Sequence, residues 1–150
     1  MAETHWNKLG AYLKETQILG SIQNTLYWDQ NTGMPKIGAS WRSEQLTYIA
    51  KVLHERNSSE EFSNLIQSAK NELLDTERNS YNQLLTKDKE RNISLLLKEF
   101  NRERNLDPKL VESLAKAKSK GYESWQEAKT KSDFKIFLPF FEELIKLRIE

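Results

Sequence analysis

The 150-residue sequence has no cysteine, five glycines, three prolines and two histidines. Without cysteine there is no disulfide scaffold, no thiol nucleophile and no cysteine-ligated zinc site. Glycine and proline are both absent from Ala39 to Asp107, whereas a β-rich fold of this size needs turn residues about every ten positions. The scarcity of turn residues therefore predicts an all-α protein.

The chain also lacks a surplus of charge and a long apolar run. Lys and Arg number 23 against 22 Asp and Glu, whereas nucleic-acid binding needs a clustered basic surplus. Lys116, Lys118 and Lys120 alternate with Ala and Ser, which is typical of a solvated helix face. No window approaches the roughly 20 apolar residues of a membrane span, and the first residues do not resemble a signal peptide. We expect a cytoplasmic protein without nucleic-acid or membrane partners.

Apolar residues recur at helical spacing along the chain and predict an antiparallel bundle of about five to six helices. Residues 29–35 are rich in polar residues, Gly and Pro, and are expected to form a loop. Ser58 and Glu61 have the spacing of a capping box, and Asp107 followed by proline is a strong helix start. The expected helices cover about residues 3–28, from between 35 and 40 to about 56, 59–73, from Asp75 or Thr76 to about 100, 108–128, and the segment after Ser132.

The last segment, Phe134 to Glu150, is mostly apolar on nearly every side of a helix. This pattern is typical of a fully buried helix, and no Gly, Asn or Pro ends it. One interpretation is an amphipathic terminal helix with a wide apolar face. We favour the other, in which the protein continues and this chain is its N-terminal part.

The histidines do not form a zinc motif. His54-Glu55 is followed by Arg56, Asn57 and Ser58, so the second His of a His-Glu-x-x-His motif is missing. Zinc bound through this motif needs two imidazoles one turn apart on one helix face. We therefore assign no catalytic, metal or cofactor residue, and expect His54 to be an ordinary residue near a helix C-terminus.

Asp29 and Arg42 flank the predicted loop between the first two helices. A carboxylate at a helix C-terminus opposes the helix dipole and needs a partner, and a guanidinium offers planar donors to it. Gln45 lies three residues beyond Arg42 and shares its helix face. We expect Asp29 and Arg42 to be in direct contact, either to hold the first helical hairpin together or to meet a substrate or a neighbouring domain.

The motif around Asp29, Arg42 and Gln45 also contains Trp28, Met34, Pro35 and His54, and a second group near the end contains Trp125, Asp133, Phe134 and Pro139. Together these residues resemble the carboxypeptidase Taq family, the thermostable zinc metallocarboxypeptidases. The resemblance spans the chain and is weakest from about Gln67 to Leu106. The motif residues, which we expect to be structural, are Trp28, Asp29, Met34, Pro35, Arg42, Gln45, His54, Trp125, Asp133, Phe134 and Pro139.

The resemblance implies an all-α metallopeptidase fold with a deep groove. Residues 1–150 would form a single helical region, the N-terminal wall or lid of that groove. It also implies a zinc (or cobalt) ion held beyond this chain, removal of C-terminal amino acids from peptides, and a cytoplasmic homodimer. The partners of this piece would be the remainder of the catalytic chain and, in the intact enzyme only, the peptide substrate. The piece alone would be inactive. The alternative is a free-standing, non-enzymatic helical scaffold or interaction module derived from that family.

Overall fold

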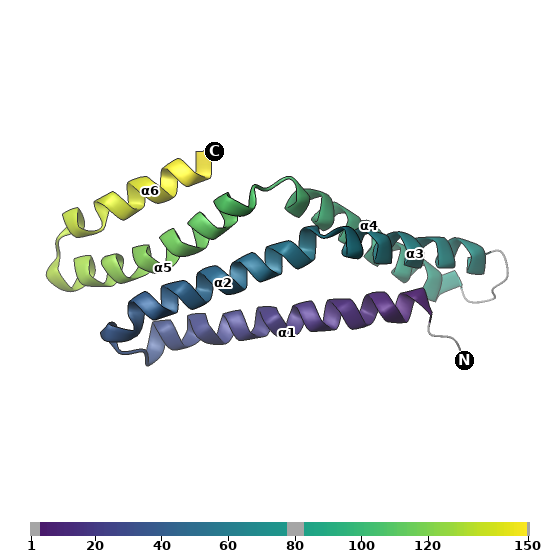
Figure 1. The fold of residues 1–150 in the computed structure, drawn as a ribbon, viewed down its shortest axis with the longest axis horizontal. Helices are drawn as coiled ribbons and strands as arrows, with labels where there is room; N and C mark the ends of the chain where they lie inside the picture. Colours follow the sequence, from purple (N-terminus) through teal and green to yellow (C-terminus); the bar gives the residue numbers. More distant parts are fainter. Residues whose placement is uncertain (1–3, 78–82, 150) are drawn as a thin grey trace. The chain divides into compact units, whose positions relative to one another are not determined.

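The computed structural model describes residues 4–77 and 83–149, and within them it contains helices and no strand (Figure 1). The all-α prediction is therefore confirmed. No helix in this part of the chain combines the length and the apolar character that a bilayer crossing requires. The elements are α1 (His5–Thr32), the 3₁₀ helix η1 (Lys36–Gly38), α2 (Ala39–Ser58), α3 (Glu60–Glu77), α4 (Gln83–Arg104), α5 (Pro108–Lys131), the 3₁₀ helix η2 (Phe134–Ile136) and α6 (Leu138–Ile149).

The chain divides into two compact units. The first unit contains residues up to 18 and 54–106, and the second contains residues 19–53 and those from 107 onward. The helices α1 and α2 each contribute residues to both units.

The core of the first unit is built from α1, α3 and α4. On α3 the buried residues Phe62, Ile66, Ala69 and Leu73 recur at the spacing of one helix face. They pack with Leu9 and Tyr12 of α1 and with Ile93 and Phe100 of α4. Burying an aliphatic or aromatic side chain of this size contributes about 1.5–3 kcal/mol, so this cluster is the main source of stability in the unit.

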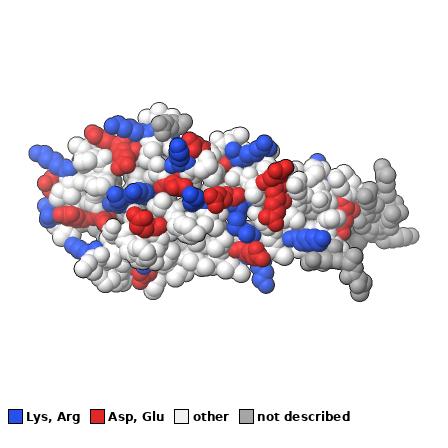
Figure 2. All heavy atoms as spheres, viewed as in Figure 1, with Lys and Arg blue, Asp and Glu red and all other residues white. Residues whose placement is uncertain are grey.

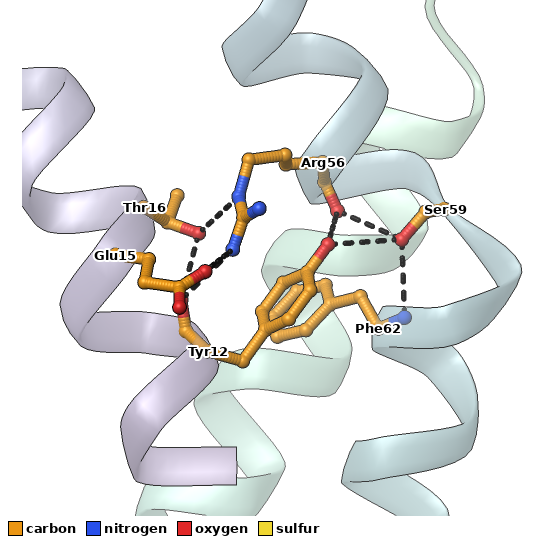
Figure 3. Close-up of polar contacts among 6 residues, drawn as sticks. All are labelled: Tyr12, Glu15, Thr16, Arg56, Ser59 and Phe62. Atoms are coloured by element: carbon orange, nitrogen blue, oxygen red, sulfur yellow. Dashed lines mark hydrogen bonds and ion pairs between the residues drawn. The ribbon is translucent and has the colours of Figure 1, made fainter. Parts of the chain in front are cut away.

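Tyr12 fixes the corner between α2 and α3, as Figure 3 shows. Its ring stacks on Phe62 with the centroids 5.3 Å apart. Its hydroxyl donates to the carbonyl of Arg56 at 2.9 Å and lies 3.1 Å from Oγ of Ser59. Ser59 Oγ in turn accepts from the backbone N–H of Phe62 at 3.0 Å. One buried tyrosine thus contacts both the last turn of α2 and the residue that caps α3.

The Arg56 side chain closes the same corner against α1 (Figure 3). Its guanidinium carbon lies 4.2 Å from the Tyr12 ring centroid, a cation–π contact. Its nitrogens donate to Thr16 Oγ1 at 3.1 Å, to the Tyr12 carbonyl at 3.3 Å and to Glu15 Oε2 at 3.1 Å. The turn from α2 into α3 is therefore held by polar contacts over an apolar base.

In the second unit α5 and α6 pack side by side (Figure 1). Asp107 caps α5 by accepting from Lys109 N at 2.8 Å, with Pro108 in the first turn, so the predicted start of this helix is confirmed. At Gly121 a Cβ atom would lie 3.4 Å from Leu144 and 3.8 Å from Phe137. These are ordinary van der Waals distances, and they mark the point where the apolar face of the α6 segment packs on α5. Ser132 ends α5 with φ 52°, a left-handed conformation.

The exact ends of three predicted helices were wrong. α1 continues through Asp29 to Thr32, where a loop was expected, and Thr32 Oγ1 donates to the Trp28 carbonyl at 2.7 Å. Ser59, not Ser58, caps α3, because the Ser58 hydroxyl donates back to the His54 carbonyl at 2.7 Å. α3 includes Asp75 and Thr76, so neither starts the next helix. The part of the expected fourth helix that covers residues 78–82 lies outside the described residues.

The terminal segment is not one continuous helix. It forms η2 and then α6, and none of the residues of α6 is buried. One face, with Phe137, Phe140 and Leu144, packs toward α5 at Gly121. The other presents Leu138, Phe141, Ile145 and Ile149 to solvent at helical spacing, and we call these four residues the α6 stripe. α6 is therefore apolar on both faces, as predicted, but only one is covered here.

Acidic and basic side chains are mixed on the face that Figure 2 shows. Among the described residues in this view, Lys and Arg lie beside Asp and Glu without a broad patch of one sign. This distribution agrees with the near-neutral total of the sequence. Whether the protein avoids nucleic acid stays a prediction.

The two adjacent serines before α3 allow a matched test of the cap. Ser59→Ala removes the acceptor for the Phe62 N–H and should lower the free energy of unfolding by about 1 kcal/mol. Ser58→Ala removes only a hydroxyl bonded within α2 and should change it by less than about 0.5 kcal/mol. Urea unfolding followed by circular dichroism measures both. Equal effects of the two substitutions would contradict the assignment of Ser59 as the cap.

Candidate functional site

Arg42, in the first turn of α2, uses three different donors, two toward the end of α1 and one toward Gln45 of its own helix. Nη2 donates to Asp29 Oδ2 at 2.6 Å, Nη1 donates to the Leu26 carbonyl at 2.5 Å, and Nε donates to Gln45 Oε1 at 2.9 Å. The predicted contact between Asp29 and Arg42, and the shared face with Gln45, are confirmed. The Arg42 side chain is 12% exposed and that of Asp29 is 43% exposed, so the ion pair lies at the edge of the unit.

The backbone around Asp29 shows how α1 ends. The Asp29 carbonyl accepts from the N–H groups of Gly33 and Met34, both at 3.0 Å. The chain then turns at Pro35, in extended conformation, into η1 and α2. The motif residues Asp29, Met34 and Pro35 therefore form one helix end and its exit, and Arg42 fixes this end in place.

Gln30 connects the same part of α1 to α5. It is buried, and its Nε2 donates to both the carbonyl and Oγ of Ser119 at 3.3 Å. Nearer the middle of α2, Lys51 pairs with Glu112 of α5 at 3.3 Å, an exposed contact. In the second unit α5 is thus tied both to the end of α1 and to α2.

Gln30 also lines a hollow of about 510 Å³, which we call the motif hollow. One side is formed by Gln30, Met34, Lys36 and Ala39, and α5 forms the other. The α5 residues are Tyr122, Glu123, Trp125, Gln126, Glu127, Lys129 and Thr130. Motif residues that are 91 positions apart in sequence, Met34 and Trp125, therefore line one depression.

Trp125 is the exposed aromatic wall of the motif hollow, with 43% of its surface accessible. Lys129 Nζ lies 5.3 Å from its ring centroid, and the Tyr122 ring lies 5.8 Å away. Glu127 bonds Lys131 at 2.6 Å, and this hydrogen bond lowers the pKa of Glu127 and raises the pKa of Lys131. The wall therefore combines an aromatic face with charged groups of both signs.

The remaining motif residues lie elsewhere. Trp28 is largely exposed on α1, and Phe134 and Pro139 are exposed at the turn into α6. Asp133 caps η2 by accepting from Lys135 N at 3.0 Å. His54 belongs to the first unit, where it is 3% exposed and its Nδ1 lies 3.3 Å from Glu103 Oε2. It lies four residues before the last residue of α2, so the expectation of an ordinary residue near a helix C-terminus is confirmed.

A family model described as carboxypeptidase Taq (M32) metallopeptidase matches residues 8–150. The chain belongs to this family. The resemblance inferred from the motif residues is therefore confirmed.

The family members that match are much longer than this chain. Thermostable carboxypeptidase 1 of Thermus thermophilus is 26% identical over 148 residues, which are 99% of this chain and 28% of that protein. Thermostable carboxypeptidase 1 of Pyrococcus furiosus is 30% identical over 86% of this chain and 24% of its own length. The chain thus spans about a quarter of the length of these relatives.

Solved structures show the same fold. The crystal structure of BsuCP superposes on this chain with a TM-score of 0.81 at 24% sequence identity. The superposed part is 97% of this chain and 27% of the BsuCP chain. The Pyrococcus furiosus carboxypeptidase in its apo-Mg form gives a TM-score of 0.64, also at 24% identity, and covers 98% and 28%. The helical arrangement of the chain is therefore that of a part of a family carboxypeptidase.

A metallopeptidase requires a metal site, and the residues described here do not fit one. His54 and Glu103 form a pair without a third ligand, and nowhere in residues 4–77 or 83–149 do three His, Cys, Asp or Glu side chains cluster closely enough to hold an ion. In the sequence, Ser58 occupies the position where the second His of the zinc motif would stand.

Sequence reasoning missed Gln30, Ser119 and Tyr122, which the structure places at or beside the motif hollow. Gln30 stands next to Asp29 in a polar stretch, and polar residues there indicated a loop. Ser119 stands among alternating Lys, Ala and Ser residues, which indicated a solvated face. The sequence signal for Ser119 was the group of small residues Ala115, Ala117, Ser119 and Gly121, which indicates a packed helix surface. All four are buried on α5.

The Arg42 contact predicts a large loss of stability on truncation. Arg42→Ala should lower the free energy of unfolding by about 2–3 kcal/mol, because it removes three hydrogen bonds and leaves Asp29 opposed to the helix dipole. Solvent reaches Asp29, so the loss stays below that of a fully buried ion pair. Arg42→Lys should recover only part of it, because an ammonium lacks the planar fork.

The control is the exposed pair of Lys51 and Glu112. Lys51→Ala should cost less than about 1 kcal/mol, as surface ion pairs do. Urea unfolding of the four proteins gives the comparison. If Arg42→Ala cost no more than Lys51→Ala, Arg42 would not be the residue that fixes the end of α1.

Proposed function

We propose that this chain is the non-catalytic helical part of a metallocarboxypeptidase that removes C-terminal amino acids from peptides. It would form a wall or lid of the groove in which the remainder of the enzyme acts. The observation that carries the proposal is the family match over residues 8–150, which corresponds to less than a third of the length of the relatives.

The architecture of the second unit supports this role. Arg42, Gln30 and the cap at Asp107 hold α1, α2 and α5 in a fixed frame. The α6 stripe presents an apolar face at the edge of that frame. Contiguous exposed apolar surface of this kind is typical of an interface with another protein segment, and the remainder of the enzyme is the segment we propose to cover it.

The finer features of the family belong to the same proposal. We place the zinc (or cobalt) ligands outside these 150 residues, and the intact enzyme in the cytoplasm as a homodimer. The absence of cysteine, and with it of disulfides, suits a reducing compartment. The peptide substrate would meet this chain only in the intact enzyme.

A chimera tests the proposal directly. In Carboxypeptidase 1 of Bacillus subtilis, which is 28% identical over 121 residues, the matching segment is replaced by this chain. We expect a protein lacking the segment to be inactive and the chimera to release C-terminal amino acids from peptides in the presence of zinc or cobalt. A folded chimera that binds metal but stays inactive would favour the alternative, a non-enzymatic interaction module.

The chain alone should be catalytically inactive. With zinc or cobalt and peptides that carry free C-termini, amino-acid analysis should detect no release above a buffer control, because the zinc motif is incomplete at Ser58. Metal-dependent release that disappears in His54→Ala would show that this chain holds its own active site and would overturn the assignment.

The α6 stripe should make the isolated chain self-associate. Phe141→Ser together with Ile145→Ser removes two apolar side chains from the stripe and should shift the chain toward monomer in sedimentation velocity at high concentration. Glu142→Ser on an exposed position of the same helix is the control and should leave association unchanged. A strictly monomeric wild-type chain would mean that the stripe does not mediate self-association. It would favour the alternative, a free-standing non-enzymatic helical module.

A further inference from the structure

The two units differ in where their large apolar side chains lie. The buried cluster of α1, α3 and α4 belongs entirely to the first unit. Of the described residues in the second unit, those that are both apolar and buried are Ala39, Leu46, Ala115, Ala117 and Ala128. Leu46 is the one large side chain in this set, and the other large apolar side chains described in the unit are half-buried or exposed. The second unit therefore has little apolar core of its own.

The interior of the second unit is also polar. Gln30, Ser43, Ser119 and Ser124 are buried there, and Oγ of Ser43 and Oγ of Ser124 have no hydrogen-bond partner among the described residues. Small side chains bury little apolar surface, and a buried hydroxyl without a partner opposes folding. Contacts inside the unit are thus a weak source of stability, which makes contacts on its surface important.

Exposed apolar side chains are concentrated in this same unit. In the described part of the first unit the large ones are Ile18, Leu74, Leu95 and Leu106. The second unit exposes Trp125, Phe134 and the α6 stripe, and it exposes five more between residues 19 and 53. We call these five the hairpin residues: Ile22, Trp28, Ile37, Trp41 and Tyr48. Single exposed apolar residues are normal, whereas many on one small unit are typical of an interface.

Trp28 and Trp41 are the most informative of the hairpin residues. They are 67% and 70% exposed, although tryptophan is highly buried on average in folded proteins and is enriched at the centres of interfaces. Trp28 directly precedes Asp29, and Trp41 directly precedes Arg42, so the 2.6 Å ion pair fixes the backbone beside both. A rigid part of the hairpin thus carries both rings, which lowers the entropy cost of docking.

The remainder of the family enzyme is the occupant that the comparisons favour. This chain corresponds to about a quarter of the length of the curated relatives, so in each relative a much longer stretch of chain is present to cover the second unit. A permanent interface of this kind resembles a domain core cut in half, with aromatic and aliphatic side chains on both sides. A weak internal core together with exposed tryptophans is the pattern expected on such a surface.

We propose that the second unit, and not the first, docks against the remainder of the metallocarboxypeptidase chain. The hairpin residues are buried in this contact against an apolar surface of the partner, with Trp28 and Trp41 as its anchors. The contact completes the core that the second unit lacks, while the first unit folds around its own core and stays solvated. This inference rests on the proposed function and extends it from the α6 stripe to the hairpin.

Hydrogen exchange followed by mass spectrometry tests the proposal in the chain alone, at a concentration at which it is monomeric, and in the Bacillus subtilis chimera. In the chain alone, amides of residues 19–53 and 107–149 should exchange at least about tenfold faster than those of the first unit. In the chimera they should slow by at least about tenfold, whereas amides of residues 4–18, 54–77 and 83–106 should change by less than about threefold. Mixing the chain with the Bacillus protein that lacks its own segment gives a second assembly for the same measurement.

The outcomes separate this inference from the proposed function. Slower exchange of the second unit in an inactive chimera would support the docking and contradict the carboxypeptidase role. An active chimera in which the first unit gains the protection would overturn the docking alone, and so would the absence of protection from both assemblies. If a higher concentration of the isolated chain slowed the hairpin amides as much as the chimera does, the occupant would be a second copy and the proposal would be wrong.

Trp41→Ser tests the hairpin itself. The matched control is Leu95→Ser, which changes an apolar side chain of the first unit that is also exposed. In the chain alone both variants should change exchange by less than about threefold, as surface substitutions do. In the chimera, Trp41→Ser should remove at least about tenfold of the protection gained by residues 19–53, and Leu95→Ser should remove none. An equal effect of Trp41→Ser in the chain alone would assign this side chain to the unit's own packing and overturn the proposal.

Discussion

The guanidinium of Arg42 is the constraint on which the second unit depends. A single side chain near the start of α2 donates to the Asp29 carboxylate, to the Leu26 carbonyl and to the Gln45 amide. Because these acceptors lie on two helices, the side chain can bond all of them only when the end of α1 occupies one position along α2. In that position Gln30 contacts Ser119, and Met34 lines the same hollow as Trp125.

The first unit is held by a different kind of contact. Its core is a set of aliphatic and aromatic side chains from α1, α3 and α4, and polar bonds appear mainly at its corner. There Tyr12 and Arg56 contact the last turn of α2 and the cap of α3. Apolar burial supplies most of the stability of this unit, whereas hydrogen bonds to the backbone define where its helices begin and end.

The sequence was sufficient for the fold class and for the contact between Asp29 and Arg42. Both follow from strong local rules, the lack of turn residues and the conflict between a carboxylate and a helix dipole. The extension of α1 to Thr32 was not predictable from propensity. Polar residues there favour a loop in isolation, whereas in the structure the last turn is stabilised by the Thr32 hydroxyl and by Arg42 of the partner helix.

The candidate sites were less predictable because their residues are small or polar and belong to different helices. Ser58 and Ser59 are equally good caps by type, and the choice depends on which hydroxyl reaches the His54 carbonyl. Ser43 and Ser124 are indistinguishable in sequence from solvent-exposed helix serines. Only the approach of α2, α5 and the α6 segment to one another buries them.

The residue that ends α5 is a position at which a substitution would make the protein more stable. Ser132 has φ 52°, while the neighbouring Asp133 N–H bonds to the Ala128 carbonyl at 2.9 Å and its carboxylate caps η2. A left-handed conformation costs a residue with a Cβ about 1 kcal/mol, and glycine avoids this cost. The turn that brings α6 back along α5 is therefore formed against the intrinsic preference of its own residue. Packing at Gly121 and capping by Asp133 are strong enough to impose it, and glycine in place of Ser132 would adopt the same geometry with less strain.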